Sequence, residues 1–396
     1  MPVGPHGDHR HGPERARPRA RGHRAPAPPG LLHPRGPDRP QAADRPHGPD
    51  HLQHPAHLRR PAGTGRRHWA IRGTGTFLPE RRVSSEELSR TLGLAPGWIE
   101  RRTGIRHRHV ADPDQAASDL AAEAARRALL AAGLEPADIG LIVLGTSTPD
   151  ELGPSTACRV QALLGARDAA AFDVAAACSG FVYGLQAALG WLSWQPDRAP
   201  HALVIGVEVY SRFLDDGDRA TRALFGDGAA AAVIGPAPAP YGIGPVVLGS
   251  DGSRAGDVLI PAGGSRRPAS PATLASRDHT IHMDGAAVRD FIADILPRLV
   301  EQATRQADIK PSDLALVVPH QPNPLLVDSL ADRAGLDPGQ MVIAGYEVGN
   351  IGAASLPYAL DHALRTRGIA PGELVLLAGF GAGLTWGHTL ITWPPA

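Results

Sequence analysis

The stretch PADIGLIVLG (residues 136–145) recurs 175 residues further along the chain as PSDLALVVPH (residues 311–320). Superposing Pro136 on Pro311 also pairs Asp138 with Asp313, Leu141 with Leu316, and Val143 with Val318. The apolar run in each copy is typical of a parallel strand that is buried on both faces. Helical periodicity precedes each copy, at residues 119–132 and 290–306. Helix, Pro, Asp and buried strand thus occur twice, which indicates an internal duplication.

Two further apolar stretches, residues 202–207 and 374–378, come late in each copy and have the character of strands. We therefore predict an α/β fold of two similar halves packed together, each with its own sheet. The N-terminal half is assigned to residues 69–240 and the C-terminal half to residues 241–396. In such sheets, the loops at the carboxyl ends of the strands carry the functional residues.

Residues 1–68 differ from the rest of the chain in composition and pattern. They contain 13 Arg, no Lys and five acidic residues, a net charge of +8, whereas the remainder carries −8. They also hold 10 of the 18 His and 14 of the 39 Pro, and they show neither helical nor strand periodicity. Because such a segment buries too little apolar surface to offset its chain entropy, we expect a disordered tail.

Three interpretations of this tail compete. A basic arm would bind nucleic acid through Arg–phosphate contacts, but no aromatic residue is interleaved with the arginines. A histidine tract would bind metal, but no two His have i,i+4 spacing on a helix that the sequence supports. We favour the third interpretation, GC-rich DNA translated upstream of the true start or across a frameshift, which agrees with Lys310 being the only lysine. No nucleic-acid partner and no metal site are expected.

Composition excludes other classes of protein. The chain has 396 residues and is 42% hydrophobic, enough for a sizeable core in two or three domain-sized units. Two cysteines exclude a disulfide-stapled secreted scaffold and indicate a cytoplasmic protein. No apolar run reaches the roughly 18 residues of a membrane span, and the N-terminus lacks the apolar core of a signal peptide.

Cys178 stands at a predicted strand-to-helix turn. It follows an apolar strand, AFDV (171–174), and precedes SGFVYGLQAALGWL (179–192), which has helical spacing. The positive end of a helix dipole lowers the pKa of a thiol, and small neighbouring residues allow a substrate to approach. A buried, inert cysteine is the alternative. Cys158, in STACRVQALL, is expected to be packed in a helix.

His320 and Asn350 are two further candidates. His320 directly follows the duplicated strand of the second half, in VVPHQPN, where the site is expected. Asn350 lies in GYEVGNIGAAS, a Gly-rich stretch suited to presenting a side-chain amide at close range. Considered alone, each residue also has a structural interpretation. His320 could be a core histidine whose hydrogen bonds are made inside the protein, and Asn350 could simply form a turn.

Several long motifs occur in a fixed order. WIERRTGIRHRHVA (98–111) and PSTACRVQALLGARDAAAFDVAAACSGFVYGL (154–185) are followed by FGDGAAAAVI, PHQPN, GNIGAAS and GFGAGLTWG. From about residue 69 to residue 396, the chain thereby resembles the β-ketoacyl-[acyl-carrier-protein] synthase III family, which has the thiolase fold. The first motif is similar to the family's tryptophan-bearing entrance segment, and the second to its nucleophile region.

The resemblance implies a catalytic triad of Cys178, His320 and Asn350. Cys178 would take an acyl group from acyl-CoA, and a malonyl thioester would then lose carbon dioxide. His320 and Asn350 would donate hydrogen bonds to the resulting enolate, which attacks the acyl group. The backbone N–H groups of Cys178 and Ala382 would form the oxyanion hole. No metal or cofactor is required.

The resemblance also implies binding residues and an assembly. Five residues are expected to bind CoA or the substrate: Trp98 and Arg219 at the adenine, Arg102 at the nucleotide, Asn323 at the pantetheine arm, and Phe225. Two are expected in the acyl pocket, Gly153 and Phe380. The expected partners are acyl-CoA, a malonyl-carrier protein and a second copy of the chain, because the acyl pocket borrows a loop of the partner subunit.

The sequence departs from the family pattern at several positions. The family motif HQAN is replaced by HQPN in this chain, and the family motif GNTSAAS by GNIGAAS. Near the C-terminus, Ala382 replaces the middle glycine of the family's GGG. Gly153, which precedes Pro154, replaces a residue that is often bulky in the family. This suggests a primer larger than acetyl.

A further departure concerns the carrier protein. The helix expected to dock it, PLLVDSLADRAG (324–335), has two Asp, one Arg and no Lys, and Leu325 replaces the expected Arg. Because charge complementarity speeds encounter, this disfavours a generic acidic carrier. A dedicated carrier, CoA or a small-molecule acceptor remain as alternatives.

Three functions follow from these observations. A decarboxylating ketosynthase is favoured by the intact triad, serving fatty acid biosynthesis or secondary polyketide priming. The alternative is an acyltransferase of the same fold, which passes the acyl group to an oxygen or nitrogen nucleophile with His320 as general base. A non-catalytic partner subunit is disfavoured, because all three catalytic residues are present.

Overall fold

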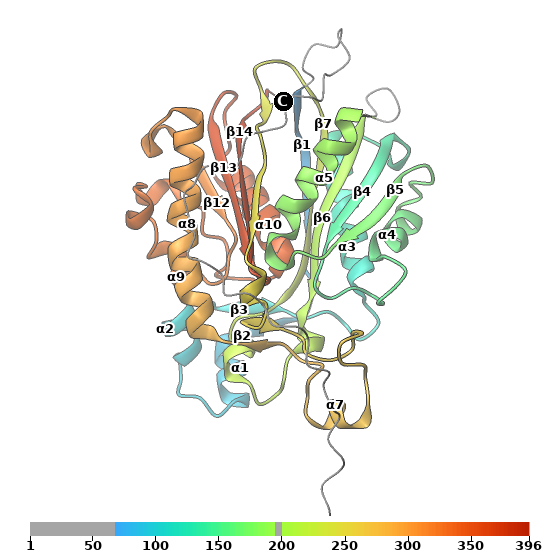
Figure 1. Ribbon diagram of the computed structural model, residues 1–396, viewed down its shortest axis with the longest axis vertical. Helices are drawn as coiled ribbons and strands as arrows, with labels where there is room; N and C mark the ends of the chain where they lie inside the picture. Colours follow the sequence, from blue (N-terminus) through green and yellow to red (C-terminus); the bar gives the residue numbers. More distant parts are fainter. Residues whose placement is uncertain (1–67, 195–199, 396) are drawn as a thin grey trace, which may run out of the picture. The chain divides into compact units, whose positions relative to one another are not determined.

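Two five-stranded sheets form the centre of the described chain, which in this computed structural model comprises residues 68–194 and 200–395 (Figure 1). The first sheet contains, in spatial order, β1 (His68–Phe77), β7 (Asp227–Ala237), β6 (His201–Val209), β4 (Ile139–Gly145) and β5 (Ala170–Val174). The second contains β12 (Leu316–Pro319), β13 (Leu374–Gly381), β14 (Thr385–Thr392) and β8 (Gly242–Ile243), with β9 (Val247–Ser250) also paired to β14. The predicted α/β fold with a sheet in each half is confirmed.

The pairing of strands is mixed in both sheets. β4 is parallel to β5 and to β6, and β12 is parallel to β13. The other pairs, β1 with β7, β6 with β7, β13 with β14, and β14 with β8 and β9, are antiparallel. We propose residues 69–240 and 241–396 as the two halves, because the strands of the first sheet precede residue 240 and those of the second follow it.

Helices and sheets alternate in five layers (Figure 1). The helices are α5 (Gly180–Trp194) and α10 (Ser355–Thr366) between the sheets, α3 (Ala117–Ala132) and α4 (Thr156–Leu164) outside the first sheet, and α8 (Gly285–Ala307) outside the second. Phe181 of α5 and Leu356 of α10 pack in one apolar cluster with Val143 of β4 and Val318 of β12. The two duplicated strands therefore face each other across the central helical layer.

The remaining elements are short. They are β2 (Arg82–Ser84), α1 (Ser85–Thr91), α2 (Trp98–Thr103), β3 (His107–His109), α6 (Arg219–Arg222), β10 (Val258–Leu259), α7 (Pro271–Ala275), β11 (His282–Met283) and α9 (Pro324–Asp328). Figure 1 shows α1, α2, α7, β2 and β3 gathered at one end of the sheets.

The duplication extends to the ends of the helices that precede β4 and β12. Gly133 after α3 and Asp308 after α8 both have left-handed backbones, with φ of 64° and 54°. The next residue then donates its N–H to the carbonyl five positions earlier, Leu134 to Leu129 and Ile309 to Thr304, both at 3.0 Å. This arrangement satisfies carbonyl groups that the end of a helix leaves free.

The repeated Pro-x-Asp motif has a structural reason. The carboxylate of Asp138 accepts the N–H of Glu135 at 2.9 Å, and that of Asp313 accepts the N–H of Lys310 at 2.8 Å. Each carboxylate closes a single 3-10 turn that begins with the Pro and leads directly into the buried strand. The motif therefore fixes how the chain enters each sheet.

Residues 1–67, nearly all of the expected tail, lie outside the described residues. Among the helices that are described, none has the length and apolar character needed to cross a membrane. Within residues 68–194 and 200–395, no group of three or more His, Cys, Asp or Glu side chains is arranged to hold a metal ion.

Candidate active site

The turn that carries Cys178 is sharp. β5 ends at Val174, Ala177 adopts a left-handed backbone with φ of 45°, and α5 begins at Gly180. For a residue with a Cβ, this conformation costs roughly 1–2 kcal/mol, so the surrounding structure must hold it in place. Part of that structure is Gly381 at the end of β13, where an added Cβ would lie 2.7 Å from the Cys178 nitrogen.

The protonation of Cys178 differs from the prediction. Burial, together with a smaller effect of the nearby Glu208 carboxyl, raises the pKa of the Cys178 thiol to about 12. The lowering expected from the N-terminus of α5 is therefore wrong for the resting site, because removal from water outweighs it. Cys178 rests as a thiol at neutral pH.

His320 follows β12 at the carboxyl end of the second sheet, as predicted. Its backbone N–H donates to the carbonyl of Ala378 at 2.8 Å, and its ring meets the edge of Phe380 with centroids 5.3 Å apart. Only 2% of the residue is exposed, and burial lowers the pKa of His320 to about 3. His320 is therefore neutral at physiological pH, with one ring N–H to donate.

Gln321 fixes the loop that carries His320. Its amide nitrogen donates to the carbonyls of Pro319 (2.9 Å) and Val342 (3.0 Å), and its amide oxygen accepts the N–H of Ala344 at 2.9 Å. Because its hydrogen bonds are made inside the protein, Gln321 has a structural role. The PHQPN motif thus combines a loop support with the candidate histidine.

Asn350 is held by hydrogen bonds on both its backbone and its side chain. Its backbone N–H donates to Leu224 at 2.8 Å, and its carbonyl accepts the N–H of Gly226 at 3.0 Å. Its side-chain oxygen accepts the N–H of Gly352 at 2.9 Å. The side-chain amide nitrogen is left as the hydrogen-bond donor that Asn350 can offer to a substrate.

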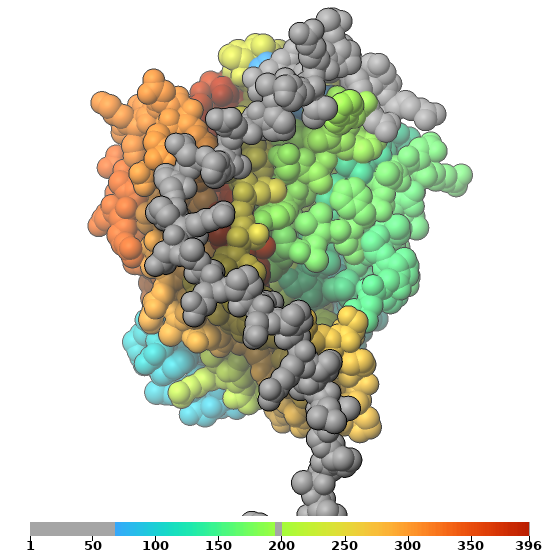
Figure 2. Space-filling view, viewed as in Figure 1, coloured from blue at the N-terminus to red at the C-terminus, as the bar shows by residue number. Residues whose placement is uncertain are grey.

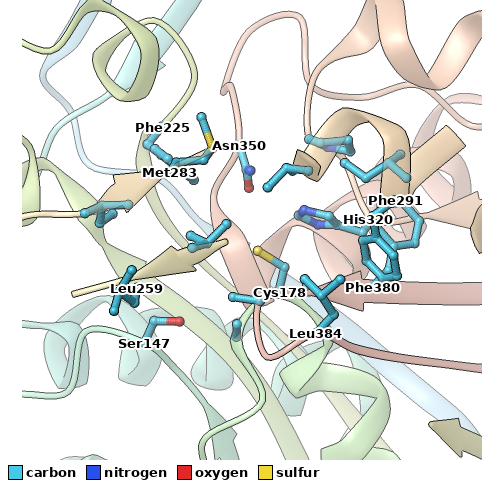
Figure 3. A pocket seen from close by; sticks show the side chains of 18 of the residues that line it. Ser147, Cys178, Phe225, Leu259, Met283, Phe291, His320, Asn350, Phe380 and Leu384 are labelled. Atoms are coloured by element: carbon cyan, nitrogen blue, oxygen red, sulfur yellow. The ribbon is translucent and has the colours of Figure 1, made fainter. Parts of the chain in front are cut away.

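The structure brings Cys178, His320 and Asn350 together at one cavity of about 290 Å³, on which their side chains converge (Figure 3). The other walls are mostly apolar and come from distant parts of the chain, among them Leu259, Met283, Phe291, Phe380 and Leu384. Ala382, expected at the oxyanion hole, also lines this cavity. The cavity suits an apolar chain that ends at a reactive thiol.

A second cavity of about 460 Å³ adjoins the first and contains the other candidate residues Trp98, Arg102, Arg219 and Asn323. The two cavities share part of their lining, including Phe225, Pro322 and Asn350. The guanidinium carbons of Arg102 and Arg219 lie 4.7 Å and 5.7 Å from the centre of the Trp98 ring. The two cavities together accommodate a long ligand with an aromatic or anionic outer end.

Two residues that the sequence analysis considered lie outside this cavity. Gly153 is exposed and does not line the cavity of its own chain. Cys158 is also exposed, so its predicted burial is wrong. The inward face of α4 is formed by Ala157, Val160 and their neighbours, whereas Cys158 lies on the outward face.

Sequence reasoning missed two residues beside Cys178. Glu208 is fully buried in β6, and the hydroxyl of Tyr210 lies 4.0 Å from the Cys178 sulfur. The signal for Glu208 was a single carboxylate within an otherwise apolar strand, LVIGVEV, since an unpaired acid is rarely buried. Tyr210 carried no comparable signal.

Family models and curated relatives identify the same family. The family model described as 3-Oxoacyl-[acyl-carrier-protein (ACP)] synthase III matches residues 172–252, and the model of its C terminal part matches residues 304–393. A β-ketoacyl-[acyl-carrier-protein] synthase III from Caldanaerobacter subterraneus subsp. tengcongensis is 42% identical over 82% of this chain and 97% of its own. Acetoacetyl CoA synthase NphT7 from Streptomyces sp. (strain CL190) is 44% identical over 82% of this chain and 98% of its own.

Solved structures agree. FabH, the 3-oxoacyl-(acyl carrier protein) synthase III of Pseudomonas aeruginosa PAO1, is 40% identical, with a TM-score of 0.76 over 83% of this chain and 99% of its own. The priming β-ketosynthase of the R1128 polyketide biosynthetic pathway is 34% identical, with a TM-score of 0.76 over 85% of this chain and 99% of its own. From its sequence and its fold alike, the chain belongs to the β-ketoacyl-[acyl-carrier-protein] synthase III family of thiolase-fold enzymes.

Proposed function

We propose that the protein is an acyltransferase that condenses an acyl group from acyl-CoA with a malonyl thioester. The observation that carries this proposal is the meeting of Cys178, His320 and Asn350 at one apolar cavity that continues into a second cavity lined by Trp98 and Arg219. The first half-reaction is acylation of the thiol. The Cys178 sulfur bonds to the thioester carbon, the bond to the CoA sulfur breaks, and the released CoA thiolate takes up the thiol proton.

The second half-reaction uses the other two residues. When the malonyl thioester loses carbon dioxide, the electron pair of the broken bond forms an enolate. His320, neutral because of its pKa of about 3, and Asn350 donate hydrogen bonds to the enolate oxygen. The enolate carbon then bonds to the acyl carbon, and Cys178 leaves as a thiolate that is reprotonated. This chemistry requires no cofactor.

The backbone N–H groups of Cys178 and Ala382 form the proposed oxyanion hole for the acyl oxygen. Support comes from Gly381, whose missing Cβ lets the end of β13 approach the Cys178 backbone closely. Both segments border the cavity that holds the thiol. Charge that develops on the acyl oxygen would therefore meet fixed donors.

The outer cavity is the proposed CoA site, with Trp98, Arg102 and Arg219 at the nucleotide and Asn323 at the pantetheine arm. Asn323 uses its side-chain oxygen to cap α9, accepting the N–H of Leu326 at 2.9 Å. Its amide nitrogen is therefore the group available to the arm. Phe225 lines both cavities, at the point where the arm would pass.

Replacing Arg219 by Ala is expected to raise the KM for acyl-CoA about tenfold, because a stacked cation at the nucleotide is lost. The KM for the matching acyl-N-acetylcysteamine thioester, which has no nucleotide, is expected to stay unchanged. Arg298→Ala is the matched control, since Arg298 is also exposed but pairs with Asp294 on α8. An equal rise in KM for both thioesters would contradict this assignment.

For the acceptor, we propose malonyl-CoA. The charged exposed residues of α9 and the turns after it are mainly acidic, with Asp328, Asp332 and Asp337 against a single Arg333. An acidic carrier protein would be repelled by this face, whereas CoA would use the basic outer cavity. The relative NphT7, whose name is acetoacetyl CoA synthase, supports a CoA-bound acceptor.

The acceptor is tested by comparing malonyl-CoA with a malonyl-carrier protein from the same organism. We expect kcat/KM to be at least about tenfold higher with malonyl-CoA, since like charges oppose docking of the carrier. In Asp332→Arg, which reverses one charge of this face at a residue outside the lining of the outer cavity, use of the carrier is expected to improve and use of malonyl-CoA to stay constant. A preference for the malonyl-carrier in the unmodified enzyme would overturn the assignment.

We further propose a homodimer. β5 is the edge strand of the first sheet, and Phe172 on it, Leu163 on α4 and Leu152 are 40%, 44% and 87% exposed. Figure 2 shows part of this flank, in teal and green, at the surface. An unpaired edge strand beside exposed apolar side chains is typical of an interface. Gly153 adjoins Leu152, so a second copy would place it near the partner subunit's acyl pocket.

The primer is proposed to be larger than acetyl. The apolar cavity of about 290 Å³ beside Cys178 is lined by Leu259 on one side and by Phe291 and Phe380 on the other, and it is larger than a two-carbon group needs (Figure 3). Gly153, exposed and without a side chain, would leave further room in the partner subunit.

A further inference from the structure

Tyr210 is a polar side chain beside Cys178 that the proposed mechanism does not use. It begins the turn after β6 and is 4% exposed, with its ring packed on Phe225 at 4.7 Å between centroids. Its hydroxyl lies 4.0 Å from the Cys178 sulfur, and both residues line the inner cavity. Burial holds the pKa of Tyr210 well above its usual value, so the hydroxyl keeps its proton.

Gly352 makes room for that hydroxyl. Its backbone is left-handed, with φ of 53°, and an added Cβ would lie 2.6 Å from the Tyr210 oxygen and 2.5 Å from Cγ of Glu208. A side chain at residue 352 and the hydroxyl of Tyr210 therefore compete for one space. The family motif GNTSAAS has Ser where this chain has Gly352, so the departure noted in the sequence coincides with the tyrosine.

Glu208 fixes the strand end from which Tyr210 projects. Its carboxylate accepts the N–H of Ser147 at 3.0 Å, the hydroxyl of Thr148 at 3.0 Å and the N–H of Ala353 at 3.4 Å. Burial raises the pKa of Glu208 to about 8. Glu208 is therefore mostly protonated at neutral pH, and any negative charge that it gains opposes formation of the Cys178 thiolate. A hydrogen-bond donor close to the sulfur acts in the opposite direction.

We propose that Tyr210 is a further catalytic residue, whose hydroxyl donates a hydrogen bond to the Cys178 sulfur as the thiolate forms and attacks the thioester. This rests on the proposed function in one respect, that Cys178 is the nucleophile. The titratable groups that border the sulfur are Glu208 and Tyr210 from the first half and His320 from the second. Among these groups, Tyr210 has its hydroxyl 4.0 Å from the sulfur, and its hydrogen bond lowers the pKa of the thiol and so favours the thiolate.

The test is Tyr210→Phe, which removes one oxygen and keeps the ring that packs on Phe225. The background is Cys158→Ser, because Cys158 is exposed and Cys178 is then the only cysteine. Alkylation by iodoacetamide, measured by intact-protein mass, is expected to slow about tenfold. This factor corresponds to the low end of the free energy that a hydrogen bond to a charged atom contributes. The rates are compared at about pH 7, where the thiol is protonated and Glu208, with its pKa of about 8, is mostly neutral.

The matched control is Tyr183→Phe, which loses a hydroxyl that donates to Gly249 at 2.9 Å. Its alkylation rate is expected to equal that of the background protein. If Tyr210→Phe alkylates at the background rate, the hydroxyl only fills space and the proposal is wrong. Since iodoacetamide requires no acyl transfer, this result is independent of whether any acyl-CoA acylates Cys178, which tests the proposed function separately.

Discussion

His320→Ala is expected to lower the rate of condensation by about a hundred- to a thousandfold, the usual cost of removing one donor from a developing oxyanion. Acylation of Cys178 is expected to continue, because His320 serves the enolate and not the first transfer. The two half-reactions are separated by intact-protein mass after acyl-CoA alone and by release of carbon dioxide from malonyl-CoA. The variant is therefore expected to accumulate as acyl-enzyme.

The pH dependence of decarboxylation gives the same residue a second readout. Because burial lowers the pKa of His320 to about 3, its ring stays neutral through the range from about pH 5 to about pH 8. No loss of the histidine's contribution is expected as the pH falls through its ordinary value. His362→Ala, on α10 away from the cavity, controls for loss of a histidine. A folded His320→Ala protein that decarboxylates malonyl-CoA at the normal rate would contradict this role.

Cys178→Ala is expected to abolish condensation, lowering it by at least about ten-thousandfold, as is usual when a covalent nucleophile is lost. Decarboxylation of malonyl-CoA without a primer is expected to persist, since the donors His320 and Asn350 remain. Coupled product detection measures the first reaction and carbon dioxide release the second. Loss of both activities in a folded protein would show that the thiol also serves decarboxylation, and the assigned division of roles would be wrong.

Much of the fold was predictable because a local rule acts twice. The Pro and Asp of residues 136–138 and 311–313 form the same kind of turn in both halves. The helix before each turn ends at a residue with a left-handed backbone. These are short-range hydrogen bonds, which sequence spacing reports directly. The presence of a sheet in each half was predictable from the apolar runs, which form strands that are buried on both faces. The helix end at Asp308, where a glycine is more common, has no strong sequence signal.

The site was predictable only in part. Cys178, His320 and Asn350 each lie at a turn that the pattern marks, and family resemblance assigned their roles. The pKa of Cys178 was misjudged because it depends on burial by residues far away in the chain, such as Leu384 and Met283. Cys158 was placed in the core because helical spacing does not show which face of a short helix meets the sheet.

The most direct test of the central claim is intact-protein mass spectrometry of the enzyme with a panel of acyl-CoAs, beside Cys178→Ala. We predict an adduct of acyl mass that is absent from the variant, forms with primers longer than acetyl, and is discharged by malonyl-CoA with release of carbon dioxide. Formation with acetyl-CoA alone would contradict the proposed primer. An adduct that malonyl donors leave in place would contradict the condensation and favour transfer to an oxygen or nitrogen nucleophile.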